Sequence, residues 1–480
     1  MNAVAQDILL PIQSPRGSSN TTVCLVAADI LAVECALYLG CLLRSMLQSL
    51  VPIVIRAPEY EMLCIGVLTL PVGYYWMGLY PGYGIGAVTR LRNRVYATLL
   101  VFSVLLWWNS LFEQAQWSRG ILLGTTLFSL ILPPLFEAIV RAGLAKAGKS
   151  GMPVVVLGAD RSGCLVLERL QQQPALGLLP VAVLDDDHRK WGKMIHGVPV
   201  MGPLSTASKY CGQAKAAIVT LAEIDHDRLL QIVQGLAFPS VIVVPNLIGL
   251  QTLWTVSRDL GGVLGIELRK NLLIKRNRVL KRVLDYSLAL PLAILFAPVV
   301  LVCAIFVKFS SPGPVFFRQQ REGEDGRQIK ILKLRTMYVD AERRLSEYLD
   351  SNPQQKHHWH RYYKLKRDPR IVPIIGKFLR TSSLDELPQL WNVLAGHMSL
   401  VGPRPFPDYH LGSFPKDFRE LRRSVAPGIT GLWQVSERSN ADLTAQQALD
   451  THYIRNWSVW LDIYILAKTV WTVVSPRGAY

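Results

Sequence analysis

Acidic residues and cysteines are scarce in this chain. Of 480 residues, 35 are Asp or Glu and 52 are Lys or Arg, which gives a formal net charge of +17 at pH 7. Such an excess of positive charge is typical of proteins that bind nucleic acid, an anionic membrane or a phosphorylated substrate. Half of the residues are hydrophobic and lie in long runs, so we expect a membrane partner and no nucleic acid.

The seven cysteines form no pattern that predicts a metal site or a disulfide. No CxxC or Cys/His ligand spacing occurs. An odd, scattered set argues against a disulfide framework, so we interpret these residues as small buried hydrophobes. The N-terminus also lacks a short apolar core followed by a cleavage site, which predicts that no signal peptide is removed.

Four apolar stretches in residues 1–149 are each close to the roughly 20 residues that cross a bilayer as a helix. They lie at about 21–43, 62–79, 95–112 and 120–140, and they predict a four-helix transmembrane bundle. Asp29, Glu34 and Glu137 interrupt them. Because a charge in lipid is costly, we expect these acids to face the bundle interior, with an interfacial position as the alternative.

Basic residues next to these helices predict their orientation. They form two groups: Arg90, Arg92 and Arg94 before the third helix, and Arg141, Lys146 and Lys149 after the fourth. Lys and Arg concentrate in cytoplasmic loops. Both ends of the bundle, and the chain that follows it, should therefore be cytoplasmic.

Residues 150–265 alternate between strand-like and helix-like segments, which predicts a parallel α/β sheet. The turn Gly158-Ala-Asp-Arg-Ser-Gly163 resembles a dinucleotide fingerprint, and Asp185 stands where a ribose-binding acid is found. However, Asp160 replaces the second glycine, and its carboxylate would repel the phosphates of a ligand. We interpret this region as a degenerate Rossmann-like domain for assembly or regulation, with nucleotide binding as the alternative.

A further apolar segment, at about 286–309, follows the basic run 275–282. Basic residues flank it on both sides, and Lys and Arg favour the cytoplasmic face. Pro298 lies near its middle, where proline removes a backbone donor and bends a helix. These features predict a kinked helix that enters and leaves the membrane by the same face. A plain spanning helix is the alternative.

Charged side chains gather after about residue 313, where we expect a soluble domain. Asp385 and Glu386 are adjacent, and Ser383 and Glu386 have the spacing of a capping box, so the acids could simply begin a helix. The cations of the same region favour a site instead: Lys333, Arg335, Arg380 and Arg404.

This mixture of charges suits chemistry on a diphosphate. A guanidinium pairs with two phosphate oxygens at once, and acids among cations suit Mg²⁺. A carboxylate that attacks a diphosphate meets about 4 kcal/mol of repulsion per unit pair at 4 Å and a surface-like dielectric. Cations offset that repulsion and stabilise the transferring group. A helix cap and a site are compatible, because one turn can position both acids.

Six motifs carry a resemblance to a known family. In order, they are Lys281-Arg-Val-Leu-Asp285, Pro298, Lys333-Leu-Arg-Thr-Met337, Ser383-Leu-Asp-Glu-Leu387, Gly402-Pro-Arg-Pro405 and Pro427-Gly-Ile-Thr-Gly431. Over residues 275–480 the chain resembles the monotopic phosphoglycosyl transferases, and as a whole it resembles their long-form members. The expected fold class is a membrane α/β protein with a transmembrane bundle (1–149), a Rossmann-like domain (150–265) and a mostly α catalytic domain (275–480). The re-entrant membrane helix would span about 283–309.

The resemblance implies transfer of a hexose-1-phosphate from a UDP-sugar to undecaprenyl phosphate by a ping-pong route. Asp385 would attack the β-phosphate and release UMP, and undecaprenyl phosphate would then attack the phosphosugar on the enzyme. A single displacement stays open. UDP-galactose is the expected donor and UDP-glucose the alternative. The reaction would begin O-antigen, capsule or exopolysaccharide synthesis at the inner (cytoplasmic) membrane of a bacterium.

The resemblance also implies roles for individual residues. Asp385 would be the nucleophile and a ligand of Mg²⁺, and Glu386 would assist with the acceptor or the metal. The substrates would be held by Lys333, Arg335, Arg380, Arg404 and Arg438. Membrane re-entry would depend on Pro298 at the bend and on three residues that anchor the helix at the interface, Lys281, Arg282 and Asp285. We also expect a homodimer.

Three positions depart from the family pattern. His397 replaces the usual aspartate, Glu437 the usual glycine, and Ala297 a frequent serine. None of them belongs to the Asp-Glu pair, so the expected reaction class is unchanged. The metal and nucleotide contacts near His397 and Arg438 are left open.

Two further segments carry weaker signals. His357, His358 and His360 lie beside Trp359 without an acidic partner at ligand spacing, which favours a basic, aromatic interfacial loop over a metal site. Residues 414–425 predict an amphipathic helix on anionic lipid, with a solvated cytoplasmic helix as the alternative.

Two other protein classes are alternatives to a transferase. One is a non-catalytic membrane sensor that binds a sugar nucleotide in the α/β domain, and the other is a membrane-bound oxidoreductase. Both require an intact glycine fingerprint at 158–163, which Asp160 interrupts. The oxidoreductase also lacks an evident set of hydride-handling residues, so the transferase is favoured.

Overall fold

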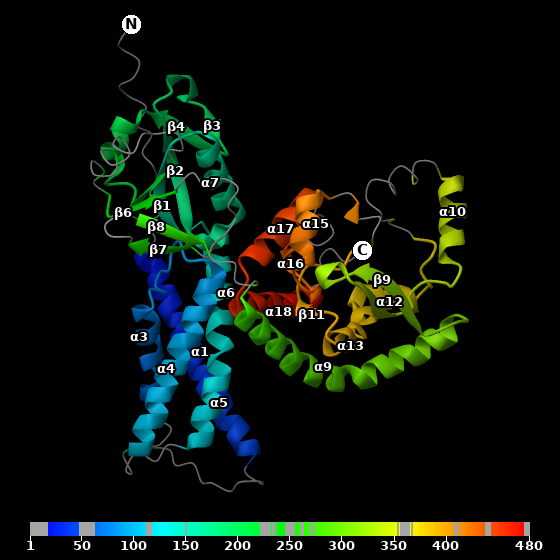
Figure 1. The fold of residues 1–480 in the computed structure, drawn as a ribbon. Coiled ribbons are helices and arrows are strands. Elements are labelled where there is room, and N and C mark those ends of the chain that lie inside the picture. The colour runs from blue at the N-terminus through cyan, green and yellow to red at the C-terminus, as the bar shows by residue number, and fades with distance from the viewer. Residues whose placement is uncertain are drawn as a thin grey trace. The chain divides into compact units, whose positions relative to one another are not determined.

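The computed structural model describes residues 18–47, 63–111, 118–148, 151–220, 232, 236, 238–244, 255–259, 264–268, 272, 274–352, 355, 365, 368–407, 411–412, 414–436 and 443–474. The chain forms two compact units, Met1–Gly249 and Leu250–Tyr480 (Figure 1). The first unit holds a helical bundle and an α/β sheet. The second holds one long apolar helix and a mixed body of helices and short strands.

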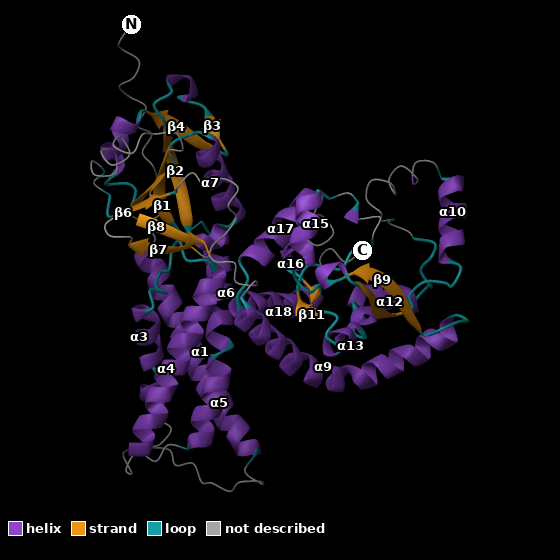
Figure 2. Ribbon diagram, in the orientation of Figure 1, coloured by secondary structure: helices purple, strands orange, loops and turns teal. Residues whose placement is uncertain are grey.

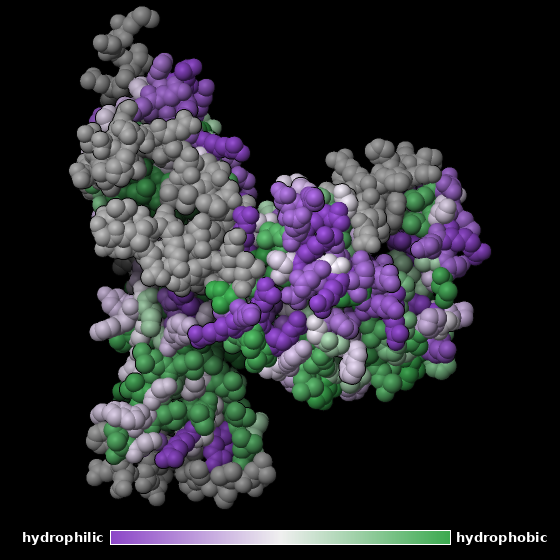
Figure 3. Space-filling view, viewed as in Figure 1, coloured by the Kyte–Doolittle hydropathy of each residue, from purple (hydrophilic) through white to green (hydrophobic). Residues whose placement is uncertain are grey.

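The bundle is built from apolar helices, and their bounds are α1 (Ser18–Met46), α3 (Thr69–Trp76), α4 (Ala87–Leu111), α5 (Arg119–Ser129) and α6 (Leu132–Lys146). Thr21–Met46, Ala87–Leu111 and Arg119–Lys146 are long and apolar enough to cross a membrane, and Leu63–Trp76 is a shorter apolar helix. Leu31, Trp107 and Ile139 are each more than half exposed, and apolar side chains cover the bundle in Figure 3. The four predicted apolar helices are thus found, the second one shorter than expected.

A buried charge cluster ties α1, α4 and α6 together. Arg94 donates from Nη1 and Nη2 to the two carboxylate oxygens of Asp29 at 2.8 and 2.9 Å, and from Nε to Glu137 at 2.7 Å. Arg141 Nε donates to the other oxygen of Glu137 at 2.7 Å. The expectation that Asp29 and Glu137 face the interior is confirmed. Arg94 and Arg141, used above as signals of orientation, are buried in these pairs.

Replacing Arg94 with methionine is expected to destabilise the protein by about 3–5 kcal/mol, because Asp29 and Glu137 would stay buried without their shared cation. The melting temperature of the protein in detergent should fall. Arg92→Met, two residues away on α4, is the matched control, since Arg92 donates only a long 3.4 Å bond to its neighbour Asn93 in the described structure. Equal melting temperatures for the two variants would contradict this account.

The α/β sheet has the strand order β3-β4-β2-β1-β5-β6 (Figure 2). Its parallel strands are β1 (Met152–Leu157), β2 (Leu178–Leu184), β4 (Val198–Gly202), β5 (Ala216–Val219) and β6 (Ser240–Val243), and β3 (Met194–Ile195) is antiparallel to β4. Alternate residues of β1 enter two cores. α7 (Arg161–Gln172) contributes to one core and the 3-10 helix η3 (Leu204–Tyr210) to the other. Both faces are covered, as a parallel sheet requires, and the predicted parallel α/β sheet is found.

The second unit begins with the antiparallel strands β7 (Thr255–Asp259) and β8 (Leu264–Leu268), followed by α9 (Lys275–Ser310). α9 is apolar enough to cross a membrane and contains Pro291 and Pro298. It follows a bowed path, and the rest of its unit packs on the concave side (Figure 1). Proline removes a hydrogen bond and bends a helix. Re-entry through one membrane face stays a prediction.

The body of this unit combines two small sheets with several helices. β9 (Phe316–Glu322) pairs with β10 (Gln328–Leu334) as an antiparallel hairpin, and β11 (Ser399–Val401) is parallel to β12 (Gly428–Thr430). The helices are α10 (Ala341–Ser351), α12 (Ile375–Ser382), α13 (Gln389–Leu394), α15 (Lys416–Arg423), α16 (Leu432–Ser436), α17 (Leu443–Arg455) and α18 (Val459–Val474).

Close backbone contact explains two of the glycines in the sequence motifs. A Cβ on Gly428 would lie 2.0 Å from the backbone nitrogen of Gly402, and a Cβ on Gly402 would lie 2.6 Å from the carbonyl oxygen of Ala426. No side chain fits at these distances. The Gly-Pro-Arg-Pro and Pro-Gly-Ile-Thr-Gly motifs are therefore in contact, at the end of β11 and the start of β12.

The prediction that residues 414–425 rest on lipid is wrong. Phe414 and Phe418 are 6% and 4% exposed, and their rings lie 5.1 Å apart in a core that includes Phe406 and Trp433. The apolar face of α15 packs inside the protein. Sequence periodicity finds an amphipathic helix but does not show whether its apolar side meets lipid or protein.

Candidate active site

Asp385 and Glu386 lie in a tight turn between two helices of the second unit. α12 ends at Ser382, Ser383 adopts a left-handed conformation (φ 57°), and the 3-10 helix η6 (Leu384–Glu386) leads to α13. The predicted capping box is wrong. The Ser383 side chain caps nothing, and the carboxylate of Glu386 has other partners. A non-glycine residue in this conformation costs about 1–2 kcal/mol, so the surrounding packing must hold the turn.

Two cations hold the carboxylate of Glu386. Lys333 Nζ donates to Oε1 at 2.6 Å, and Arg404 Nη2 donates to the same oxygen at 2.6 Å. Arg404 Nη1 lies 3.4 Å from Oε2. These cations hold the pKa of Glu386 well below its usual range, so the residue is a fixed anion and is unsuited to exchange protons near neutral pH.

β10 brings Lys333 to this place, and Asn392 fixes β10 against α13. Asn392 Oδ1 accepts a bond from the backbone nitrogen of Leu332 at 2.9 Å, and its Nδ2 donates to Lys330 O at 2.8 Å. The side-chain amide therefore bonds the edge of β10 as the backbone of a neighbouring strand would. Asn392 thus has a structural role.

Asp385 differs from its neighbour, because its carboxylate has no hydrogen bond or ion pair within the described residues. The residue is 8% exposed. Burial, followed by the negative charge of Glu386, raises the pKa of Asp385 to about 6, against the lowering effects of Lys333, Arg380 and Arg404. A buried, desolvated carboxylate without a fixed partner is a stronger nucleophile than a paired one. It is charged at neutral pH and close to three cations.

Arg380 extends this cationic surrounding. Its Nε donates to Thr336 Oγ1 at 2.9 Å, and its charge lowers the pKa of Asp385 without a direct ion pair. The predicted set of Lys333, Arg380 and Arg404 thus converges on the Asp-Glu pair, although these residues are separated by as many as 71 positions in the sequence.

Arg335 does not belong to this set. Its Nη1 donates to Pro312 O at 2.8 Å and its Nη2 to Ser311 O at 2.7 Å. These bonds hold the chain that leaves α9, and the residue is 5% exposed. The prediction that Arg335 binds substrate is therefore corrected to a structural role. Arg438 and Glu437, together with the histidines at 357–360, lie outside the described residues.

The residues expected to anchor α9 at the lipid interface instead contact the protein. Lys281 Nζ donates to Val401 O at 2.9 Å and to Asp462 at 2.8 Å, and Arg282 donates to Met398 O at 2.9 Å. Asp285 accepts bonds from the backbone of Leu400 at 3.0 Å and from the Ser399 hydroxyl. They bind the start of α9 to β11, three residues before Arg404. Pro298 lies within the bowed helix, as expected.

The donor set fits Mg²⁺ only if a phosphate accompanies the ion. The described residues contain no group of three or more His, Cys, Asp or Glu side chains that could hold a metal. Glu386 is occupied by two cations, whereas Asp385 is available. Mg²⁺ commonly binds one or two carboxylates and completes its coordination with phosphate oxygens and water. Asp385 is therefore the residue that would hold it.

The second candidate site, in the α/β domain, is filled by its own side chains. Asp185 accepts a bond from the backbone nitrogen of Ala159 at 2.7 Å, and Lys190 Nζ lies 2.6 Å from Asp160 and 3.1 Å from Asp185. Asp185 thus holds the glycine-rich turn, where a dinucleotide site would use it to bind a ribose. Lys190 neutralises Asp160, a contact that the sequence did not reveal.

Comparisons with known proteins place this chain in a family. The profile of the family described as bacterial sugar transferase matches residues 276–476, and that of a CoA-binding domain matches residues 77–243. The UDP-galactose-lipid carrier transferase of Erwinia amylovora is 33% identical, over 85% of this chain and 86% of the relative. The undecaprenyl-phosphate galactose phosphotransferase of Salmonella typhimurium is 31% identical, over 85% and 86%.

A third relative carries a different sugar in its name. The UDP-glucose:undecaprenyl-phosphate glucose-1-phosphate transferase of Escherichia coli is 34% identical, over 70% of this chain and 71% of the relative. The fold, the charged turn and these relatives define a membrane-bound sugar transferase. The chain belongs to the bacterial sugar transferases, and among them to the long-form phosphoglycosyl transferases.

Proposed function

We propose that this protein transfers galactose-1-phosphate from UDP-galactose to undecaprenyl phosphate, giving undecaprenyl-diphosphate-galactose and UMP. The observation that carries this proposal is the Asp385 carboxylate, which is buried and has no partner among the described residues, beside a Glu386 that two cations hold. Galactose is favoured because the two relatives named for it match about 85% of the chain, whereas the glucose relative matches 70%. Transfer of glucose-1-phosphate is the second candidate, supported by that relative's name.

The reaction follows from the roles of the site residues. An oxygen of Asp385 attacks the β-phosphorus, the bond to the bridging oxygen breaks, and UMP leaves with the bonding electrons. An oxygen of undecaprenyl phosphate then attacks the same phosphorus and regenerates the Asp385 carboxylate. Bound Mg²⁺ would supply positive charge that neutralises the diphosphate. Arg380 and the remaining N–H groups of Arg404 would hold phosphate oxygens, while Lys333 keeps Glu386 in place.

The basic residues on both sides of α9 support a location at the cytoplasmic face of the membrane. The second unit would lie on the cytoplasmic face of the bacterial inner membrane, with α9 dipping into one leaflet. Figure 3 supports this placement, because apolar side chains gather over α9. The transfer would be the first membrane step of O-antigen, capsule or exopolysaccharide synthesis. A homodimer stays a prediction.

A donor panel tests this proposal. Purified protein with undecaprenyl phosphate and Mg²⁺ should release UMP from UDP-galactose at least about 10-fold faster than from UDP-glucose, the discrimination that one well-placed hydroxyl contact can give. Without undecaprenyl phosphate, release should stop near one UMP per protein. Faster turnover of UDP-glucose would support the second candidate. No release from any UDP-hexose would contradict both.

A further inference from the structure

Residues 401–404, which place Arg404 beside Glu386, are held by hydrogen bonds to their backbone groups. Val401 O accepts bonds from Lys281 and from the hydroxyl of Tyr453, both at 2.9 Å. Gly402 N donates to Thr430 O at 2.9 Å, and Pro403 O accepts from Gly428 N at 2.9 Å. Buried backbone groups need partners, and here the partners come from α9, α17 and β12.

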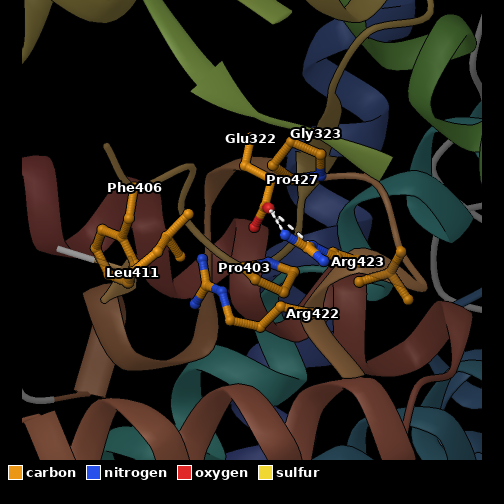
Figure 4. Close-up of a pocket in the computed structure, with 9 residues that line it drawn as sticks. Glu322, Gly323, Pro403, Phe406, Leu411, Arg422, Arg423 and Pro427 are labelled. Atoms are coloured by element: carbon orange, nitrogen blue, oxygen red, sulfur yellow. Dashed lines mark hydrogen bonds and ion pairs between the residues drawn. The ribbon is translucent and has the colours of Figure 1, made fainter. Parts of the chain in front are cut away.

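The last group of this segment, the carbonyl oxygen of Arg404, has a charged partner. Arg422 of α15 donates from Nη2 to this oxygen and from Nη1 to Asp450 of α17. Both residues are nearly inaccessible, at 8% and 1% exposed. The guanidinium carbon of Arg422 lies 4.5 Å from the ring centroid of Phe406. Figure 4 shows the Arg422 side chain beside Pro403, on the edge of a small pocket.

A buried ion pair of this kind is poorly explained by stability alone. Removing two charges from water costs several kcal/mol per ion, and apolar replacements of such pairs are often neutral or stabilising. The pair instead fixes the orientation of the groups that it contacts. Asp450 orients the guanidinium, and the guanidinium fixes the carbonyl of the residue whose side chain holds Glu386.

We propose that Arg422 and Asp450 are positioning residues for the transfer reaction, an inference that rests on the proposed function. They act through Arg404: by fixing its backbone, they keep its guanidinium on Glu386 and beside Asp385. Neither side chain needs to touch the substrate. The first half of the reaction, in which Asp385 attacks the donor, should depend on them.

The test replaces the pair with apolar residues that the surrounding core can accept. Arg422→Met combined with Asp450→Leu removes both buried charges together, so no unpaired ion is left in the core. The matched control is Arg423→Met with Glu322→Leu. Arg423 follows Arg422 on α15, and its Nε lies 2.7 Å from Glu322 at the end of β9. This pair does not contact Arg404 in the described structure.

The measurement is the burst of UMP from labelled UDP-sugar without acceptor. Its amplitude counts competent sites, and its rate constant reports the attack step. The Arg422/Asp450 variant should keep the wild-type amplitude while its rate constant falls about 10–100-fold, as expected when a supporting residue is lost. The control variant should keep both. Arg422→Lys, which retains the charge and a single donor nitrogen, should recover part of the rate.

Two results would overturn the inference: a wild-type rate constant in the double variant, or a smaller amplitude with an unchanged rate constant, which would indicate a purely structural role. If the wild-type protein shows no burst, the covalent route fails. In that case, the turnover number per folded protein is compared between the Arg422/Asp450 variant and the control variant. An equal turnover number would overturn the inference.

Discussion

Replacing Asp385 with asparagine is expected to lower sugar-phosphate transfer by about 10⁴-fold or more, the scale seen when a covalent nucleophile is removed. The amide keeps the shape of the side chain but has no negative oxygen to attack phosphorus. The loss should appear in UMP release with the preferred donor and undecaprenyl phosphate. Asp340→Asn is the matched control, because Asp340 pairs with Arg343 and Arg344 on α10 and takes no part in the site.

Loss of folding would not account for this result. Since burial raises the pKa of Asp385 to about 6, the folded protein disfavours its charged form, and a neutral amide removes that cost. The melting temperature of Asp385→Asn should therefore equal or exceed that of the wild type at pH 7. A variant that turns over at more than a few per cent of the wild-type rate would contradict the assignment.

Glu386→Gln is expected to slow the attack step by about 100-fold, since misplacing groups by 1 Å can cost that much. Lys333 and Arg404 would lose their shared anion and would be free to pair with Asp385. The burst rate of UMP release measures the effect. Glu322→Gln is the control, because Glu322 is also a half-buried carboxylate paired with an arginine, Arg423, outside the site.

The pH dependence of the attack rate tests Glu386→Gln a second time, because the direction in which its midpoint shifts can be predicted. In the wild type, the attack rate should be half-maximal near pH 6, the pKa of Asp385, and should fall about tenfold per pH unit well below it. The negative charge of Glu386 raises the pKa of Asp385, whereas Lys333, Arg380 and Arg404 lower it. Removing the Glu386 charge should therefore move the midpoint to lower pH. A midpoint that stays or rises would contradict this electrostatic account.

The sequence predicted the elements that a short stretch of residues specifies by itself. Apolar length alone located the bundle helices and α9, and the alternation of strand-like and helix-like segments over residues 150–265 predicted the parallel α/β sheet. The adjacent acids Asp385 and Glu386, among cations near motif glycines, indicated the site. Lys333, Arg380 and Arg404 were named as its surroundings because diphosphate chemistry needs cations, and the structure places all three around the Asp-Glu pair.

The predictions that failed concern residues whose roles depend on contacts with distant parts of the sequence. Arg335 stands two positions from Lys333 but just beyond the end of β10, and its guanidinium donates to Ser311 O instead of approaching Glu386. Arg422 looked like a surface charge in a basic amphipathic helix. Only its approach to Asp450, 28 positions away, makes it part of a buried clamp. The local rule for a capping box also failed, because Ser383 adopts a left-handed backbone that directs Glu386 toward cations from other segments.

The central claim, covalent catalysis by Asp385, is tested most directly by trapping the protein with UDP-sugar labelled in the β-phosphate, without acceptor, followed by mass spectrometry of its peptides. We expect one phosphosugar per protein on the peptide that contains residue 385, and its loss on addition of undecaprenyl phosphate. Label elsewhere, or UMP that is released only when the acceptor is present, would contradict the account.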